Sequence, residues 1–389
     1  MLKGLFPMRK RTRHRSLILL AVQIEASIVS PLPRSKRNHD RCGSFHVSLD
    51  FSLASNQTVR GINRSASRNM SHDEFHPRQP RAAAVLSLIG NTPLVPLRFE
   101  AENLTVYAKC EFINPSGSIK DRLAKTVLVD AEQRGLLKPD SIILECSSGN
   151  TGIALSMLGA AMGYRVAILM SQGASVERRH LIRQLGAELI LFESEGHYET
   201  GIAMSREMAE KDSRYFLPRQ FENVLNVKDH EMHTGPEIIR QLDGPVDAFV
   251  TGYGTGGTLA GVGKAIRAHF PKSRICAMEP SEAALLLGEM PCCHHIEGIA
   301  DGFLPQLLQQ APLDGEVKVS SNDAMTMTKR LHREFGLLVG TSSGANVAAA
   351  MTLARELGPD KRVVTLLCDR AERYFSTSLF DQIPTEGKA

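Results

Sequence analysis

The chain of 389 residues is long enough for two domains with substantial cores, and 42% hydrophobic and 23% charged residues are typical of a folded globular enzyme. The net charge of +4 is uneven, because residues 1–69 hold 13 lysines and arginines against three acidic residues, which leaves −6 for the remainder. A mildly acidic body argues against a nucleic-acid-binding role. No apolar run reaches the roughly 18–20 residues that span a bilayer, which argues against a membrane protein.

Residues 1–69 differ in composition from the rest, being rich in arginine and serine and poor in acids. An apolar run at 16–22 after a basic cluster is similar to a signal peptide, and the same arginine and serine bias is typical of organellar transit peptides. Such a composition cannot bury enough apolar surface to fold. We favour a disordered leader or a misassigned start, with Met70 as the true first residue, over a targeting segment.

The seven cysteines are odd in number and scattered, without the spacing of a disulfide framework. This pattern favours a reducing, cytoplasmic location. The run from Cys292 to His295 contains four ligand-type residues in a row, but contiguous residues cannot all wrap one zinc ion. The sequence therefore predicts no metal site.

Strand-like and helix-like segments alternate from residue 83 onward. The expected strands are 141–145, 165–170, 247–251, 274–279 and 362–368, and the expected helices end at 162 and 269 or span 322–335 and 343–357. Repeated strand–loop–helix units predict an α/β fold with mainly parallel sheets and helices on both faces. Ligands bind at the carboxyl ends of the strands in such folds.

Three loops rich in glycine, serine and threonine each begin a predicted helix. They span residues 147–151, 252–258 and 340–345. Helix N-termini present free N–H groups and a partial positive charge, and glycine lets the backbone approach an anion closely. The second loop, with Gly254, Thr255, Gly256, Gly257 and Thr258, is the best phosphate site. It lacks the Gly-Lys-Ser/Thr ending of a nucleotide P-loop.

Lys120 follows a Pro-Ser-Gly-Ser turn and precedes a helix-like stretch. A lysine in this setting can form a Schiff base with an aldehyde. An imine-forming lysine and a phosphate cradle in one chain point to pyridoxal phosphate as cofactor.

The body of the chain resembles the cysteine synthase (O-acetylserine sulfhydrylase) and cystathionine β-synthase family, fold-type II pyridoxal-phosphate enzymes similar to the tryptophan synthase β chain. The resemblance runs from the Gly-Asn-Thr-Pro-Leu motif at 90–94 to the Asp-Arg-Ala-Glu-Arg-Tyr motif at 369–374. Between them, the Lys-Asp-Arg motif at 120–122 and the three loops occur in the family's order.

The resemblance implies a role for each matching residue. Lys120 would bind the cofactor as a Schiff base and carry the Cα proton, Asn150 would contact the ring hydroxyl oxygen, and Ser342 would face the ring nitrogen. The loop from Gly254 to Thr258 would bind the phosphate. The substrate's α-carboxylate would be held by Ser147, Ser148, Asn150 and Thr151, with Gln220 alongside, and Gly298 would line the mouth of the site.

The resemblance further implies β-replacement through an α-aminoacrylate, with O-acetyl-L-serine and sulfide giving L-cysteine and acetate. A serine at the ring nitrogen makes a moderate electron sink, which suits β-elimination. Another nucleophile or donor remains open, as in cystathionine β-synthases or O-phosphoserine-dependent enzymes, because Asp301 lies near a position where the two groups differ. A serine/threonine dehydratase and a non-catalytic partner protein are less favoured.

The family also implies two domains and a homodimer. A large phosphate-binding domain would comprise residues 84–112 and 224–380, and a small mobile substrate domain would comprise residues 113–223. The departures from the family pattern are small. Ser147 replaces the usual threonine and keeps its hydroxyl, while Cys146 stands where proline is common.

Overall fold

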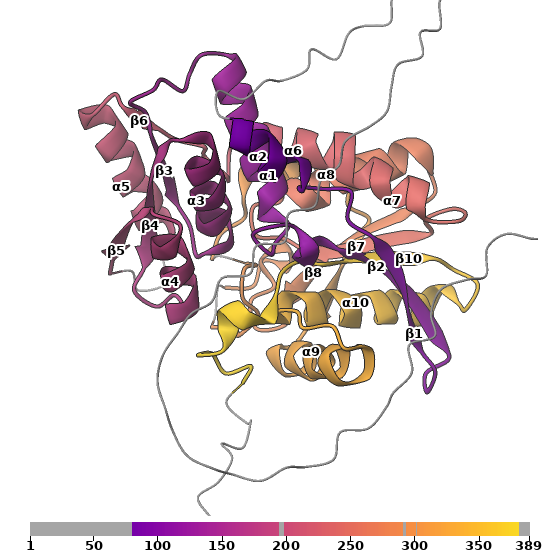
Figure 1. The fold of residues 1–389 in the computed structure, drawn as a ribbon. Coiled ribbons are helices and arrows are strands. Elements are labelled where there is room, and N and C mark those ends of the chain that lie inside the picture. The colour runs from indigo at the N-terminus through magenta and orange to yellow at the C-terminus, as the bar shows by residue number, and fades with distance from the viewer. Residues whose placement is uncertain (1–79, 194–197, 291–292, 301, 381–389) are drawn as a thin grey trace, which may run out of the picture. The chain divides into compact units, whose positions relative to one another are not determined.

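The computed structural model describes residues 80–193, 198–290, 293–300 and 302–380 (Figure 1). These residues form an α/β fold with two mainly parallel sheets flanked by helices, as the sequence predicts. Residues 1–69 lie outside the described residues, as do Met70, Cys292 and Asp301. The predictions that concern them stay predictions.

The larger sheet has six strands in the order β1-β2-β10-β7-β8-β9. Strand β1 pairs antiparallel with β2, and the remaining pairs are parallel. The parallel strands are followed by loops at one common edge, where a ligand can meet several of them. In chain order the strands are β1 (Leu94–Phe99), β2 (Leu104–Cys110), β7 (Ala248–Gly252), β8 (Arg274–Pro280), β9 (Gly315–Val319) and β10 (Val363–Leu367).

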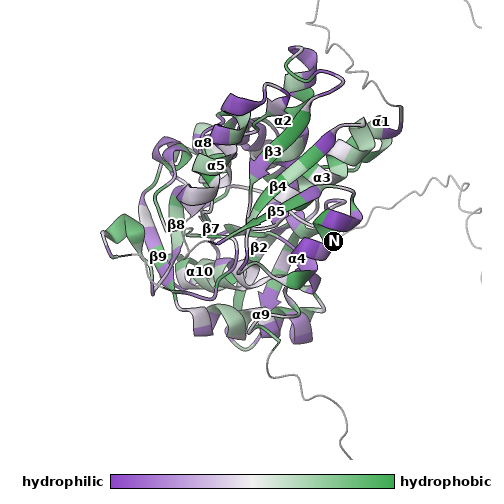
Figure 2. Cartoon of the chain, turned by 90° about the vertical axis from the view of Figure 1, so that its left-hand side faces the viewer, coloured by the Kyte–Doolittle hydropathy of each residue, from purple (hydrophilic) through white to green (hydrophobic). Residues whose placement is uncertain are grey.

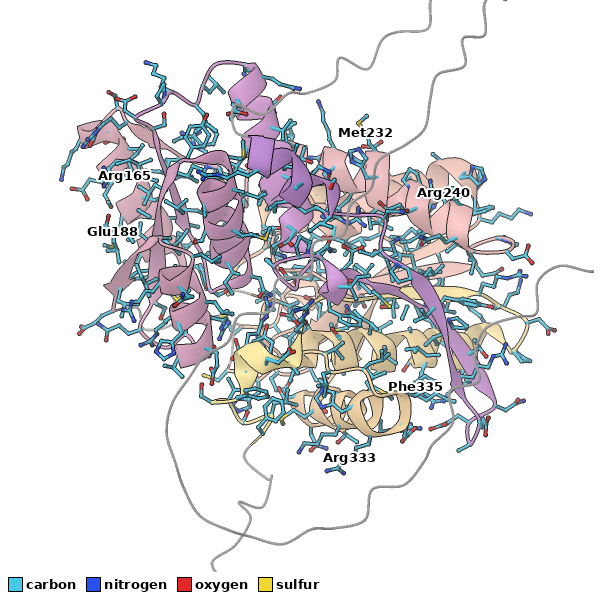
Figure 3. The ribbon with its side chains drawn as sticks, viewed as in Figure 1. Arg165, Glu188, Met232, Arg240, Arg333 and Phe335 are labelled. Carbon is cyan, nitrogen blue, oxygen red and sulfur yellow. The ribbon has the colours of Figure 1, made fainter. Side chains whose placement is uncertain are left out.

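The smaller sheet has four parallel strands in the order β5-β4-β3-β6. They are β3 (Ile142–Cys146), β4 (Arg165–Ser171), β5 (Glu188–Phe192) and β6 (Tyr215–Phe216). Figure 2 shows β3, β4 and β5 coloured largely as hydrophobic, as expected for a sheet that has helices on both faces. The charged Arg165 and Glu188 are exposed at the N-terminal ends of β4 and β5 (Figure 3). The C-terminal ends of β3 and β4 lead into the loops that precede α3 and α4.

Helices cover both faces of each sheet because strand side chains alternate between two cores. In β3, Ile143 packs toward α1–α4, whereas Ile142 and Leu144 pack toward α5. In the larger sheet, Val250 packs with α9 and α10, and Phe249 with α7 and α8. The helices are α1 (Pro80–Ser87), α2 (Lys120–Gln133), α3 (Asn150–Met162), α4 (Val176–Gln184), α5 (Tyr198–Lys211), α6 (Leu225–Asp229), α7 (Gly235–Gln241), α8 (Gly257–His269), α9 (Ser321–Phe335) and α10 (Thr341–Leu357).

The strands and helices predicted from the sequence are confirmed, with ends that differ by one or two residues. The helix predicted at 343–357 begins earlier, at Thr341, so Ser342 lies in its first turn. Residues 84–112 contribute β1 and β2 to the larger sheet, and residues 113–223 contain the smaller sheet. The domain boundaries themselves stay a prediction. Among the described residues, no helix is both long and apolar enough to cross a bilayer.

Candidate active site

Two adjoining pockets surround Lys120, the first residue of α2. We call them the first pocket and the second pocket. Of the predicted cofactor-binding residues, the first pocket is lined by Lys120, Asn150, Gly254, Thr255, Gly256, Thr258 and Ser342. Of the predicted substrate-binding residues, the second pocket is lined by Ser148, Thr151, Gln220 and Gly298, again with Lys120 and Asn150. The fold therefore gathers both predicted sets around one amine, and only Gly257 and Ser147 line neither pocket.

The start of α2 is held in place on both sides of Lys120. The N–H of Ile119 donates to the carbonyl of Cys368, the residue after β10, at 3.0 Å. Two residues after Lys120, the buried Arg122 pairs with the carboxylate of Glu111 at 2.7 Å. Helix α2 also packs against both α3 and α6, so it contacts helices associated with each sheet (Figure 1). These contacts fix the helix that presents Lys120 to both pockets.

The loop between β7 and α8 forms an anion cradle. Gly256 has φ of +82°, and a Cβ atom there would lie 2.6 Å from the backbone nitrogen of Leu308. Helix α8 begins at Gly257 and no side chain caps it, so its first N–H groups remain available. Free N–H groups and the positive end of the helix dipole favour a phosphate group at this place.

The side chains of Asn226 and His230 contact the two threonine hydroxyls of the cradle. The side-chain amide of Asn226 donates to Thr255 Oγ1 at 2.9 Å, and Thr258 Oγ1 lies 3.1 Å from Nε2 of His230. The other ring nitrogen of His230 lies 2.9 Å from Thr234 Oγ1. Burial lowers the pKa of His230 to about 4, so the ring is neutral near pH 7. No recognisable motif marks Asn226 or His230, and the sequence predicts neither as a site residue.

Ser147 shapes the loop that precedes α3. Its hydroxyl accepts hydrogen bonds from the N–H groups of Gly149 at 3.1 Å and Gly152 at 3.0 Å. The side chain is buried and lines neither pocket. Ser147 therefore acts on the loop conformation, and its neighbour Ser148 borders the second pocket.

Thr151 and Gln220 form one wall of the second pocket and contact each other, although 69 residues separate them in the chain. The hydroxyl of Thr151 donates to Oε1 of Gln220 at 2.6 Å, and Nε2 of Gln220 donates to the carbonyl of Cys146 at 2.8 Å. Two aromatic residues missed by sequence reasoning, Tyr198 and Phe221, complete this wall. Their rings pack edge to face with centroids 6.2 Å apart. The wall combines hydrogen-bonding groups with apolar surface, which suits a small amino acid.

Asn150 joins the pockets to the residues after β10. Its amide nitrogen donates to Oδ2 of Asp369 at 2.6 Å, and its amide oxygen accepts a hydrogen bond from Arg373. The hydroxyl of Tyr374 donates to the same oxygen of Asp369. The other oxygen of Asp369 is buried without a hydrogen-bond partner among the described residues. In the sequence, residues 369–374 are only the last motif of the resemblance to the family. Their contact with Asn150 is visible only in the fold.

An ion pair lies beside Gly298. Arg178 of α4 pairs with Glu297 through Nη2 and Oε2 at 3.0 Å, and Glu297 lines the first pocket. The Arg178 guanidinium lies 5.2 Å from the centre of the Tyr374 ring. The ion pair connects α4, which packs with the smaller sheet, to the segment that carries Gly298.

The metal hypothesis concerns the run that ends at His295. Within the described ranges, no three histidine, cysteine, aspartate or glutamate side chains gather in a way that could hold a metal ion. Cys293 of this run is an exposed free cysteine.

The residues around the first pocket fit pyridoxal phosphate. Lys120 supplies an amine for the aldehyde, and the cradle at α8 supplies N–H groups and hydroxyls for the phosphate. Ser342 supplies a hydroxyl from the first turn of α10. The loop also packs tightly against Leu308, because a side chain at Gly256 would collide with the Leu308 backbone.

Comparison with known proteins gives the same result. The model of the family described as "Pyridoxal-phosphate dependent enzyme" matches residues 85–369. The probable cysteine synthase of Bacillus subtilis (strain 168) is 44% identical over 306 residues, which cover 77% of this chain and 98% of that protein. The crystal structure of an O-ureido-L-serine synthase matches with a TM-score of 0.75 and 42% identity, covering 78% of this chain and 96% of the other.

A crystal structure of cysteine synthase from Entamoeba histolytica matches with a TM-score of 0.72 and 35% identity, and the match covers 84% of this chain and 96% of that one. The family model spans most of the body of the chain, from before β1 to the residue after Cys368. All three loops and Lys120 lie inside the matched range. The chain belongs to the pyridoxal-phosphate-dependent enzymes of the cysteine synthase type.

Proposed function

We propose that the enzyme converts O-acetyl-L-serine and sulfide into L-cysteine and acetate. The observation that carries this proposal is the position of Lys120, whose side chain borders both the first and the second pocket. One amine thus lies where a cofactor and an amino acid would meet. The 44% identity to a probable cysteine synthase supports the choice of substrates.

In this proposal the first pocket holds the cofactor. Lys120 would bind it covalently, Asn150 would contact the ring hydroxyl oxygen, and Ser342 would face the ring nitrogen. The phosphate would lie on the cradle formed by Gly254, Thr255, Gly256, Gly257 and Thr258. Gly257 would contribute only its backbone, which agrees with its place at the start of α8.

The second pocket would hold the amino acid by its α-carboxylate. Ser148, Thr151 and Gln220 line it with hydroxyl and amide groups, and Gly298 borders it without a side chain. Ser147 would contribute by fixing the loop through its bonds to Gly149 and Gly152. Tyr198 and Phe221 would reduce water access to the reacting carbons.

Bound pyridoxal phosphate supplies an electron sink for the substrate's Cα. Lys120, once its amine is free, would remove the proton from Cα and later return it. Acetate leaves from Cβ and sulfide adds at the same carbon, so that L-cysteine and acetate are the products of a β-replacement. The Ser342 hydroxyl cannot protonate a ring nitrogen as a carboxylic acid would, so the sink stays moderate and favours β-replacement over transamination.

The first test replaces Lys120 by alanine. We expect Lys120→Ala to lose the visible absorbance of the lysine-bound cofactor and to lower kcat at least 1,000-fold, since both cofactor anchor and proton carrier are removed (general acid–base catalysis alone contributes about 10²–10⁴-fold). The exposed Lys228 offers a matched control, and Lys228→Ala should keep both properties. An unchanged spectrum and rate in Lys120→Ala would overturn the proposal.

The identity of the second substrate is tested by comparing kcat/KM for different nucleophiles. Purified enzyme is given O-acetyl-L-serine with sulfide, thiosulfate, homocysteine or hydroxyurea, and O-phospho-L-serine replaces the donor in a parallel series. We expect the highest kcat/KM with O-acetyl-L-serine and sulfide. A higher value for another pair would replace the substrate assignment, and release of pyruvate without any nucleophile would favour a dehydratase.

We further propose a cytoplasmic homodimer. Cys110, Cys276, Cys293 and Cys368 are free among the described residues, which is compatible with a reducing compartment. The dimer is adopted from the resemblance to the family. Light scattering should give about twice the chain mass of 42.6 kDa, and a monomer mass would contradict it.

A further inference from the structure

Glu145, near the end of β3, lies behind the wall of the second pocket. Its side chain is buried, and it does not line the second pocket. It borders instead a separate small pocket on the other side of Phe221, together with Arg219 and Glu222. Any effect of Glu145 on a bound amino acid must therefore pass through other residues.

The carboxyl group of Glu145 ties the end of β3 to the loop that carries Gln220. Oε1 accepts a hydrogen bond from the N–H of Cys146 at 3.0 Å, and Oε2 accepts one from the N–H of Gln220 at 3.1 Å. Arg219, just before Gln220, has φ of +55°, a conformation that a non-glycine residue adopts only when its surroundings enforce it. The Glu145 carboxylate supplies part of that enforcement, because it holds the next N–H group in the chain.

The contacts continue from Gln220 to both pockets. The Gln220 side chain bonds to Thr151 in the second pocket at 2.6 Å. Its backbone carbonyl accepts a hydrogen bond from Asn226 at 3.0 Å, and Asn226 also donates to Thr255 in the phosphate cradle at 2.9 Å. Glu145 is thus the buried anchor of a chain of hydrogen bonds that includes residues of both pockets.

We propose that Glu145 is a positioning residue for the α-carboxylate of the amino-acid substrate. By holding the N–H groups of Cys146 and Gln220, it keeps the loop of Ser148 and Thr151 at a fixed distance from Gln220. This inference rests on the proposed function in that the second pocket is taken as the amino-acid site. It concerns recognition of the carboxylate, which every α-amino acid carries, and not the nature of the nucleophile.

The test is the substitution Glu145→Gln, which keeps the size of the side chain but turns an NH₂ group toward one of the two N–H donors. We expect KM for O-acetyl-L-serine to rise about 10-fold, the size of effect that follows from losing one buried hydrogen bond. The kcat should stay within twofold, and KM for sulfide should not change. Binding of L-cysteine, followed by calorimetry on the cofactor-loaded enzyme, should weaken by a similar factor.

Glu222→Gln is the matched control, since Glu222 lies on the same loop but pairs at the surface with Arg206. It should leave all four quantities unchanged. If Glu145→Gln does not fold, Glu145→Asp keeps the carboxyl group, shortens the reach by one methylene, and should show the same selective rise in KM. An unchanged KM, or a loss confined to kcat, would overturn the inference, whereas a wild-type enzyme that binds L-cysteine but makes none would contradict only the proposed function.

Discussion

At the scale of single residues, the surroundings of a side chain decide its chemistry. Lys120 is one of many lysines, but the backbone contact between Ile119 and Cys368 and the buried Arg122 place it at the junction of two pockets. Asn150 shows the same dependence, because both ends of its amide are already oriented by Asp369 and Arg373. An amide held in this way can present itself to a cofactor without a loss of side-chain entropy on binding.

His230 leads to a prediction about pH. Burial lowers its pKa from 6.5 to about 4, although the neighbouring Asp229 acts in the opposite direction. Below about pH 6.5 the unfolded chain therefore binds a proton that the folded chain does not. The free energy of unfolding should fall by up to about 3 kcal/mol between pH 6.5 and 4 on this account.

The measurement compares urea unfolding of the wild type and His230→Gln across this pH range. Other groups titrate in both proteins, so the difference between the two stability curves isolates His230. Asp229, with a pKa lowered to about 2, loses its contribution only at more acidic pH, below its unfolded value of 3.8. Curves that run parallel from pH 6.5 to 4 would show that the buried ring does not control this acid sensitivity.

At the scale of elements, each pocket forms where a strand ends and a helix begins. Strand β7 leads through the glycine loop into α8, and β3 leads through the serine loop into α3. Parallel strands bring such loops to a common edge, and the uncapped N-terminus of α8 there favours an anion. Helix α2 reaches the same place from elsewhere in the chain, because it packs against both α3 and α6.

A methyl group added at Gly256, in the β7–α8 loop, should lower both cofactor affinity and stability. In Gly256→Ala the residue must keep φ near +82°, and its Cβ would lie 2.6 Å from the Leu308 backbone nitrogen. We expect cofactor affinity to fall at least 10-fold and the free energy of unfolding to fall by about 1–2 kcal/mol, because the loop must shift or carry strain. Titration with pyridoxal phosphate and urea unfolding measure the two effects.

Gly315→Ala is the control for this substitution. Gly315 begins β9, and a Cβ atom there meets nothing within 4 Å. The affinity of the Gly315→Ala protein for the cofactor should equal that of the wild type. Equal affinities for Gly256→Ala and the wild type would instead mean that the cradle does not hold the phosphate.

At the scale of the whole molecule, the described residues combine two sheets whose strands are assembled from separated parts of the sequence. The larger sheet places β10, from near the end of the chain, between β2 and β7. This arrangement brings Ser342 and Asp369 to the same site as Lys120 and Asn150. The position of these residues around the first pocket therefore depends on long-range pairing, and the pocket can form only when the body of the chain is folded.

The body of the chain should fold and act without residues 1–69. The family model begins at residue 85, and the Bacillus subtilis relative is covered to 98% of its length by 77% of this chain. A protein that begins at Met70 should therefore fold and keep kcat/KM within about twofold of the full chain. Activity assays and urea unfolding of the two proteins provide the measurement, and a loss of stability or activity in the shorter protein would assign residues 1–69 a structural role.

The sequence by itself determined the strand–loop–helix order, the three glycine-containing loops and Lys120. These features are local, because hydrophobic periodicity and the backbone freedom of residues such as Gly256 are properties of short segments. Cofactor class followed from them once the motifs were recognised in their order. The resemblance to the family, and not the local pattern, predicted Ser342 as a site residue, and its helix begins two residues earlier than expected.

The tertiary structure alone decided which residues support that site. Glu145, Asn226 and His230 carry no motif, and each acts through a partner distant in the chain, such as Gln220, Thr255 or Thr258. A hydrogen bond between segments 28 to 75 residues apart depends on how helices and sheets pack together. Such packing is set by the shape and burial of the entire core, which no short stretch of sequence encodes.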